Sequence, residues 1–289
     1  MGQRQPWLAL IIGNSRWHWA AFDDDDQYPN AAGGCLGTWH TPHLSQAQVN
    51  QLKRGGFATE IWQQWGFDLG LTSDLFHLFH RNSLGNSLDF GCPELWMASV
   101  VAELVAWWAD YPALYRVETA QVPLHNSYPT LGVDRALALV GAGDSWGWPV
   151  LVIDCGTAMT FTAGAEGGLI GGAILPGLRS QFRALHTDTD QLPALDLDPN
   201  FWPNRWAADT AGAITSGILH TQLAGIRDFI AAWEADYPGG AVVLTGGDSE
   251  FVIHHLKEQT PALAQRINHD PDLGFWGLRV CRRRSLESL

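Results

Sequence analysis

The strongest chemical signal in the sequence is a glycine turn directly after the apolar run 150–153. A site for nucleotide phosphates needs backbone N–H groups at close approach, small hydroxyl side chains, and a carboxylate that places a divalent cation. Gly156 permits the close approach, and the hydroxyls of Thr157 and Thr160 can donate hydrogen bonds. Asp154 supplies the carboxylate, so we predict phosphate binding here with Asp154 as the metal ligand. Taken alone, this turn could equally be an ordinary structural hairpin.

Two other glycine turns follow apolar runs of the same kind, at Gly13-Asn14-Ser15 and at Gly246-Gly247. The first of them repeats the strand, turn, strand pattern of segment 149–162 about half a chain earlier. A duplicated core motif is the economical explanation. We therefore predict that Gly13, Asn14 and Ser15 contact the same phosphates from the first half of the chain.

The remaining apolar patterns predict the elements that position these turns. Hairpins are expected at 7–21 and 149–162, a buried strand at 241–244, and helices at 44–65, 93–108, 131–143 and 207–233. Strands that alternate with helices indicate an α/β fold. At 289 residues the chain is longer than one typical domain, so we expect two lobes, at 1–125 and 126–289.

Composition excludes several classes of protein. With 17 Lys and Arg against 30 Asp and Glu, the net charge of −13 repels phosphate backbones, so no nucleic acid partner is expected. The basic run 282–284 is predicted to be a solvated tail. No window approaches the roughly 18 apolar residues of a membrane span, so no membrane partner is expected. Four cysteines without CxxC spacing, and no signal peptide, predict a cytoplasmic protein.

The histidines carry no metal motif that the sequence makes evident. His254 and His255 are adjacent, but neither belongs to an HExxH or comparable spacing. Surface or polar-core roles are therefore predicted for both. The fifteen tryptophans are scattered along the chain, and core packing is predicted for them.

The order of the three glycine turns resembles the acetate and sugar kinase, heat-shock ATPase and actin superfamily. Two further segments narrow the resemblance to type III pantothenate kinases: Gly132-Val133-Asp134-Arg135 is similar to their GxDR motif, and 171–177 is similar to their GGxIxPG segment. The resemblance implies two RNase H-like lobes in an actin-like ATPase fold, each a duplicated ββαβ-type mixed sheet with flanking helices. It also implies a homodimer.

The activity implied by the resemblance is transfer of the ATP γ-phosphate to pantothenate, the first step of coenzyme A synthesis. Implied cofactors are ATP, Mg²⁺ and a monovalent cation, K⁺ or NH₄⁺, near the second hairpin. Gly246 and Gly247 would lie near the adenosine. Two alternatives remain at this point: a kinase of another small hydroxylated acid or sugar, and a non-catalytic binding or regulatory homologue such as the Bvg accessory factor relatives.

Asp134 suits the general base that an alcohol phosphorylation requires, because it is a carboxylate beside a glycine turn that leads into a helix. Arg135 could hold a substrate carboxylate through a two-pronged guanidinium contact. The family's matching residues imply that Tyr128 and Gly132 belong to the pantothenate pocket. The alternative is that Asp134 and Arg135 are merely an exposed pair near a helix start.

Segment 209–217 resembles the family's NTxxAIxSG helix, from which a threonine reaches the pantothenate pocket of the neighbouring subunit. Thr210 matches that threonine, whereas Asp209 stands where the family has asparagine. Thr210 is therefore implied to bind substrate.

One position departs from the family pattern. The first phosphate motif of the family reads DxGN, but this chain has Ile11 where the acid belongs. An isoleucine cannot bind Mg²⁺. Three explanations remain open: Asp154 with water ligands suffices, Asp144 substitutes for the missing acid, or the enzyme is slow or inactive.

Overall fold

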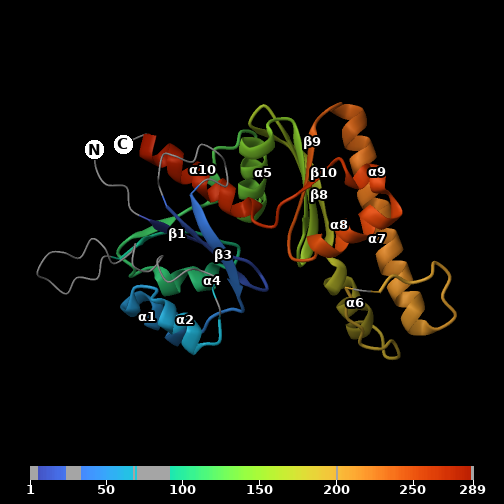
Figure 1. The fold of residues 1–289 in the computed structure, drawn as a ribbon, viewed down its shortest axis with the longest axis horizontal. Helices are drawn as coiled ribbons and strands as arrows, with labels where there is room; N and C mark the ends of the chain where they lie inside the picture. The colour runs from blue at the N-terminus through green and yellow to red at the C-terminus, as the bar shows by residue number, and fades with distance from the viewer. Residues whose placement is uncertain (1–5, 24–33, 68, 70–91, 200, 288–289) are drawn as a thin grey trace, which may run out of the picture. The chain divides into compact units, whose positions relative to one another are not determined.

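The computed structural model describes residues 6–23, 34–67, 69, 92–199 and 201–287, which form two compact units (Figure 1). The first unit comprises Met1–Pro123, Ser127–Ser145 and Gly274–Leu289, and the second comprises Leu124–Asn126 and Trp146–Leu273. The chain thus returns to the first unit twice after residue 125. The boundary at 125/126 expected for the lobes stays a prediction.

The first unit is built on a five-stranded mixed sheet. Its order is β3 (Cys35–Thr41), β2 (Trp17–Phe22), β1 (Trp7–Ile12), β4 (Glu94–Ser99), β5 (Leu114–Arg116). β2 is antiparallel to β1 and β3, whereas β1, β4 and β5 are parallel. Its helices are α1 (Gln46–Gly55), α2 (Thr59–Gln64), α4 (Ala102–Val105), α5 (Val133–Trp146) and α10 (Leu273–Glu287), with 3₁₀ turns at Ala106–Trp108 and Thr119–Gln121.

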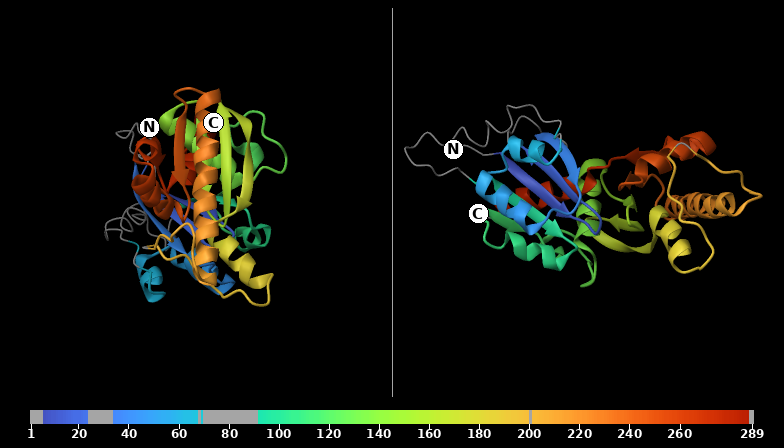
Figure 2. Two further views of the ribbon diagram at one scale, coloured as in Figure 1. Left: turned by 90° about the vertical axis from the view of Figure 1, so that its right-hand side faces the viewer. Right: turned by 90° about the horizontal axis from the view of Figure 1, so that it is seen from below.

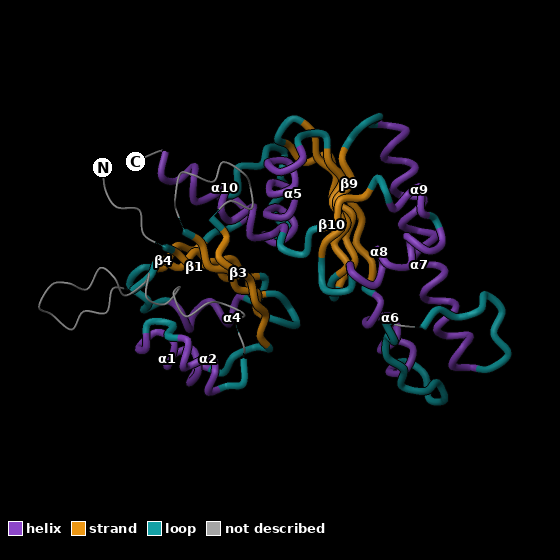
Figure 3. The backbone as a smooth tube through the Cα atoms, in the orientation of Figure 1, coloured by secondary structure: helices purple, strands orange, loops and turns teal. Residues whose placement is uncertain are grey.

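The second unit has a five-stranded sheet of its own, and the strands of both sheets are orange in Figure 3. Its order is β8 (Gly168–Pro176), β7 (Ala158–Ala165), β6 (Val150–Cys155), β9 (Ala241–Thr245), β10 (Ile267–His269). Its helices are α6 (Leu178–Thr187), α7 (Thr210–Asp236), α8 (Ser249–Gln259) and α9 (Pro261–Ala264).

The two sheets share one topology. In each, three consecutive strands form an antiparallel meander, and two later strands then add in parallel beside the first strand of that meander. This third-second-first-fourth-fifth order is the RNase H-like arrangement, present twice. The predicted α/β fold of two duplicated mixed sheets with flanking helices is confirmed.

Aromatic side chains dominate the core of the first unit. Trp17 and Trp19 are two residues apart and point to the same face of β2. Their rings pack there against Trp108, at 6.0 and 5.9 Å between centroids. Trp62 of α2 lies edge-on to Trp19 at 5.2 Å. Truncating such a buried indole to alanine typically costs about 3–5 kcal/mol, so these rings hold the hairpin in place. The predicted packing role of the tryptophans is confirmed for this cluster.

In the second unit, α7 covers one face of the sheet (Figure 2). Leu219, Leu223 and Ile226 of α7 are fully buried against strand residues such as Ile153 of β6. Even α7, the longest helix, lacks an apolar run long enough to cross a bilayer, and the same holds for the other helices of the described residues.

Two of the predicted helices are wrong in part. Segment 93–108 begins as strand β4 and becomes helical only at Ala102. β4 lies between two parallel neighbours and is almost wholly buried, so its continuous apolar run cannot be distinguished from a buried helix by periodicity. Segment 44–65 is two helices, since α1 ends at Gly55 and is followed by Gly56, a left-handed cap with φ of 61°.

The predicted solvated tail at 282–284 is wrong in part, although Arg283 and Arg284 are exposed to solvent. These arginines lie in α10, and Arg282 is only 6% exposed. Its Nε donates to Glu94 Oε2 at 3.0 Å, and its guanidinium lies 4.9 Å from the Trp7 ring centroid. Arg283 pairs with Asp144 at 2.6 Å. Arg282 therefore joins the C-terminal helix to the start of β4.

Candidate active site

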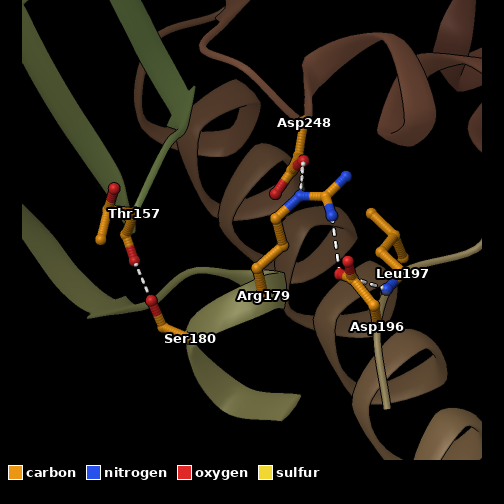
Figure 4. Close-up of polar contacts among 6 residues, drawn as sticks. All are labelled: Thr157, Arg179, Ser180, Asp196, Leu197 and Asp248. Atoms are coloured by element: carbon orange, nitrogen blue, oxygen red, sulfur yellow. Dashed lines mark hydrogen bonds and ion pairs between the residues drawn. The ribbon is translucent and has the colours of Figure 1, made fainter. Parts of the chain in front are cut away.

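The turn between β6 and β7 is held by backbone and hydroxyl contacts from two other segments. Thr157 O accepts from the Gly177 N–H at 3.0 Å and from Ser180 Oγ at 2.7 Å (Figure 4). Cys155 O accepts from the Asp248 N–H at 2.9 Å. The start of α6 and the turn after β9 thus fix the backbone of the predicted phosphate turn, while the Thr157 side chain stays exposed.

Asp154 lies between two of the predicted glycines. Gly246 has a φ of +93°, and a Cβ added there would overlap Asp154 Oδ1 and the Cys155 backbone. A Cβ on Gly156 would approach Asp154 Oδ1 to 3.3 Å. The structure therefore brings Asp154, Gly156 and Gly246 together, and explains why two of these positions lack side chains.

The environment of Asp154 fits a divalent cation of the Mg²⁺ type. A carboxylate oxygen is the ligand that this hard ion prefers. Thr160 and Thr245 pair directly with Asp154 on the neighbouring strands, so all three side chains belong to one row across the sheet, and both threonines are buried. Gly247, by contrast, borders open space, with no atom within 4 Å of an added Cβ.

The buried Cys155 thiol beside this turn is not a nucleophile. Burial raises the pKa of Cys155 well above its ordinary value, and the negative charges of Asp154 and Asp248 act in the same direction. The thiol consequently stays protonated at neutral pH.

Sequence reasoning missed Arg179, which organises the same region from α6. Its Nε donates to Asp248 Oδ1 at 3.1 Å and its Nη1 donates to Asp196 Oδ1 at 2.7 Å (Figure 4). The Arg179 side chain is about half exposed, at 53%. A signal existed, because the arginine stands only two residues after the Pro176-Gly177 pair that ends the 171–177 motif.

The first hairpin has the turn that the sequence predicts. The Gly13 N–H donates to Arg16 O at 3.0 Å, and His43 Nε2 lies 2.9 Å from Gly13 O. Asn14 and Ser15 are exposed at the tip. This turn therefore presents a backbone that is tied down on one side by an imidazole.

Ile11 is a packing residue at the place where the family pattern has an acid. It pairs with His18 across β1 and β2, and a Cβ added to Gly274 of α10 would come within 2.8 Å of its Cδ1. His18 Nδ1 lies 2.9 Å from His40 Nδ1. Burial is the main cause that lowers the pKa of His18 to about 4, and the charges of His40 and Arg16 lower it further. The His18 imidazole is therefore neutral at pH 7.

A second group of predicted residues gathers at the start of α5 in the first unit. Asp134 Oδ1 accepts the Arg135 backbone N–H at 2.8 Å, and Arg135 Nη1 donates to the Tyr128 hydroxyl at 2.9 Å. A Cβ on Gly132 would overlap Asp134 Oδ1. Thr119 Oγ1 donates to Leu131 O at 2.9 Å and steadies the preceding loop. Tyr128, Gly132, Asp134 and Arg135 thus form one cluster.

Burial raises the pKa of the Asp134 carboxyl, and the hydrogen bond from the Arg135 N–H and the Arg135 charge offset that rise only in part. Arg135 is itself 7% exposed. The two are therefore not an exposed pair at a helix start. A partly desolvated carboxylate at a helix N-terminus, beside a positioned guanidinium, can accept a proton and hold an anionic ligand.

Thr210 belongs to the second unit, whereas the Asp134 cluster belongs to the first. It is the exposed first residue of α7. Asp209 caps this helix by accepting the Gly212 N–H at 2.8 Å, so the aspartate performs a cap role for which asparagine is equally suited.

A search of solved structures finds a protein described as a Baf family transcriptional activator from Campylobacter jejuni, at a TM-score of 0.57 and 16% identity over 97% of this chain and 99% of that one. This likeness shows the shared fold.

Sequence comparison is more specific. The family model for type III pantothenate kinase matches residues 71–232. A type III pantothenate kinase of Nostoc sp. is 42% identical over 279 residues, 95% of this chain and 93% of that one. A second, from Gloeobacter violaceus, is 37% identical over 96% of this chain and 98% of that one. The chain belongs to the type III pantothenate kinase family.

Proposed function

We propose that this protein transfers the γ-phosphoryl group of ATP to the primary hydroxyl of pantothenate, giving 4′-phosphopantothenate and ADP at the start of coenzyme A synthesis. The observation that carries the proposal is the Asp134 cluster, in which a carboxylate of raised pKa adjoins a buried guanidinium fixed by Tyr128. This cluster lies within a chain that matches type III pantothenate kinases over almost their whole length.

In the proposed reaction the pantothenate hydroxyl oxygen forms a bond to the γ-phosphorus while the bond from that phosphorus to the β,γ-bridging oxygen breaks. ADP leaves with the electron pair, and the hydroxyl proton passes to the Asp134 carboxylate. Arg135 holds the pantothenate carboxylate, and Tyr128 orients the guanidinium. Gly132 leaves the space in which the Asp134 carboxylate stands.

We assign the nucleotide to the glycine turns. Gly156, Thr157 and Thr160 contact phosphate in the second unit, Gly13, Asn14 and Ser15 contact phosphate in the first, and Gly246 and Gly247 lie near the adenosine. Asp154 holds the divalent cation, which neutralises phosphate charge when bound. A K⁺ or NH₄⁺ ion near the second hairpin is proposed as a further cofactor, with oxygen ligands.

We also propose that the protein is a cytoplasmic homodimer. All four cysteines are free thiols, as a reducing compartment requires. Apolar side chains remain exposed in the second unit: Ile170 and Ile174 on edge strand β8, and Phe229 on α7. In a dimer, Thr210 at the exposed start of α7 would reach the partner's pantothenate pocket. A solution mass twice that of the 31.7 kDa chain is expected, and a monomer at micromolar concentration contradicts this part of the proposal.

The test is ADP release by the purified protein with ATP, Mg²⁺ and K⁺, with and without pantothenate, and with mass spectrometry of the product. Pantothenate-dependent ADP release with a phosphorylated product is expected. ADP release with another hydroxylated acid alone supports a different acceptor. Absence of turnover with every acceptor supports the non-catalytic homologue, which the intact Asp134 cluster does not favour.

A further inference from the structure

Helix α8 carries three side chains of metal-binding type in the pattern His-His-x-x-Glu. His254 and Glu258 are four residues apart and His255 and Glu258 are three apart, so both imidazoles lie on the helix face of the same carboxylate. His254 Nε2 lies 3.6 Å from Glu258 Oε1, and His255 Nδ1 lies 3.2 Å from Glu258 Oε2. One ligand atom from each residue lies within 4.8 Å of the other two.

His255 is the fixed member of this group. Its side chain is only 3% exposed, and its ring packs against Trp202 at 4.6 Å and edge-on to Phe251 at 4.4 Å between centroids. Its Nδ1 faces the Glu258 carboxylate, whereas its Nε2 has no hydrogen-bond partner among the residues that the structure describes.

The other two members are adjustable. The side chains of His254 and Glu258 are 56% and 57% exposed, so both can turn toward a common ligand distance of about 2.0–2.2 Å. An ion from solvent can therefore reach the two exposed ligands, His254 and Glu258, and bind the buried His255 imidazole beside them.

We propose that His254 Nε2, His255 Nδ1 and the Glu258 carboxylate form a binding site for one borderline divalent cation of the Zn²⁺ type. Two nitrogens and one carboxylate match the ligand preference of Zn²⁺, Co²⁺ and Ni²⁺, whereas Mg²⁺ and K⁺ prefer oxygen alone. Three protein ligands leave a fourth position for water. The site shares no residue with the turns assigned to ATP, so it is independent of the kinase proposal.

Metal binding would also settle the state of His255. A cation on Nδ1 requires the proton to lie on Nε2, inside the aromatic surroundings formed by Trp202 and Phe251, where an N–H can contact a ring face. The ion would join the last turns of α8 and favour the folded second unit by mass action. The simpler alternative is that Glu258 only forms ion pairs with the two histidines.

Calorimetric titration of the chelator-treated full chain with Zn²⁺, in excess Mg²⁺, separates these cases. One saturable Zn²⁺ site per chain is expected, and His254→Ala and Glu258→Gln should each weaken it by about tenfold or more. Glu250→Gln is the matched control, because it removes the charge of another α8 carboxylate that faces a histidine, His269 at 3.6 Å, outside the cluster. Its Zn²⁺ affinity should equal that of the wild type.

Co²⁺ supplies a second readout. Intense visible d–d absorption at one equivalent, lost in Glu258→Gln and kept in Glu250→Gln, indicates a low-coordinate nitrogen and oxygen site. Thermal melting without metal shows whether each variant folds, and because both substituted side chains are exposed we expect melting temperatures within a few degrees of the wild type. Absence of saturable Zn²⁺ binding, or binding that survives both substitutions, overturns the proposal.

Discussion

Ile11 of β1 and His18 of β2 are direct partners across the antiparallel hairpin that carries the Gly13 turn. An aliphatic side chain therefore stands opposite a neutral imidazole at a point where the family pattern places a metal-binding acid. Of the explanations left open by the sequence, substitution by Asp144 is the least suited, because that carboxylate already pairs with Arg283 at 2.6 Å.

Replacing Ile11 by aspartate is expected to raise the pKa of His18 above about 4, because a carboxylate on the opposing strand stabilises the imidazolium. NMR titration of the His18 ring measures the change. Ile11→Asn, which is isosteric with aspartate but uncharged, should shift the pKa far less. Equal His18 pKa values in the two variants would show that the side chain at position 11 does not reach the ring.

His18 also predicts a loss of stability in acid. Its pKa is about 4 in the folded protein against an ordinary value of 6.5, so the unfolded chain binds the proton first. The contribution of the neutral His18 to the free energy of unfolding is complete above pH 6.5. It is lost as the pH falls towards 4, by about 3 kcal/mol in total. His18→Gln cannot take up this proton. Its unfolding free energy, from urea titrations at pH 7 and 5, should therefore fall less than that of the wild type, and parallel losses contradict the account.

Asp134→Asn should lower kcat/KM by about 10²–10⁴-fold, because the amide cannot accept the hydroxyl proton but keeps the acceptor for the Arg135 N–H. Because the pKa of Asp134 is raised, the wild-type kcat/KM should begin to fall on acidification at a higher pH than an ordinary aspartate, with a pKa of about 3.9, would produce. The Asp134→Asn variant should lack this fall at acidic pH. Glu60→Gln, at another first-turn acid, is the control and should keep the wild-type profile. An unchanged rate in Asp134→Asn excludes it as the base.

Gly246→Ala should weaken ATP binding and destabilise the second unit. The added methyl overlaps Asp154, and the left-handed backbone alone costs a non-glycine residue about 1–3 kcal/mol. Gly247→Ala is the matched control for folding, since its Cβ enters open space. Melting temperatures and ATP titration of both variants give the comparison. A Gly246→Ala protein as stable as Gly247→Ala contradicts the close contact with Asp154.

Arg135→Lys should raise the KM for pantothenate while leaving the KM for ATP nearly unchanged. Lysine lacks the fork that donates to both Tyr128 and a substrate carboxylate, and one lost charge-assisted hydrogen bond of about 1.5–3 kcal/mol corresponds to about 10- to 150-fold. Arg116→Lys, at an exposed ion pair with Glu118, serves as the control. A rise in both KM values would instead indicate a general structural effect of the substitution.

Local patterns were sufficient to predict the glycine turns. Gly13 and Gly156 each follow an apolar run, and the strand, turn, strand signal lies within a few residues. The cluster at the start of α5 was also predictable, because Tyr128, Gly132, Asp134 and Arg135 are neighbours in the chain and reach one another through a single loop and helix turn.

Other features were decided only by contacts between distant segments. Strand β4 looks helical until its two parallel neighbours are known, since burial on both faces removes the alternation that marks a strand. Arg282 looks like a solvated tail until Glu94, 188 residues away, accepts its hydrogen bond. The same is true of Arg179, whose partner Asp248 comes from the turn after β9.

The sequence by itself determined which residue types are present at each turn, including the absence of an acid at Ile11. Only the tertiary structure decided what those residues meet: Ile11 faces His18 and α10, Asp154 fits between Gly156 and Gly246, and Glu258 meets two histidines. The physical reason is that chemistry at a site depends on distance and burial, which arise when strands and helices pack, whereas a sequence pattern records only the order and spacing of side chains along one chain.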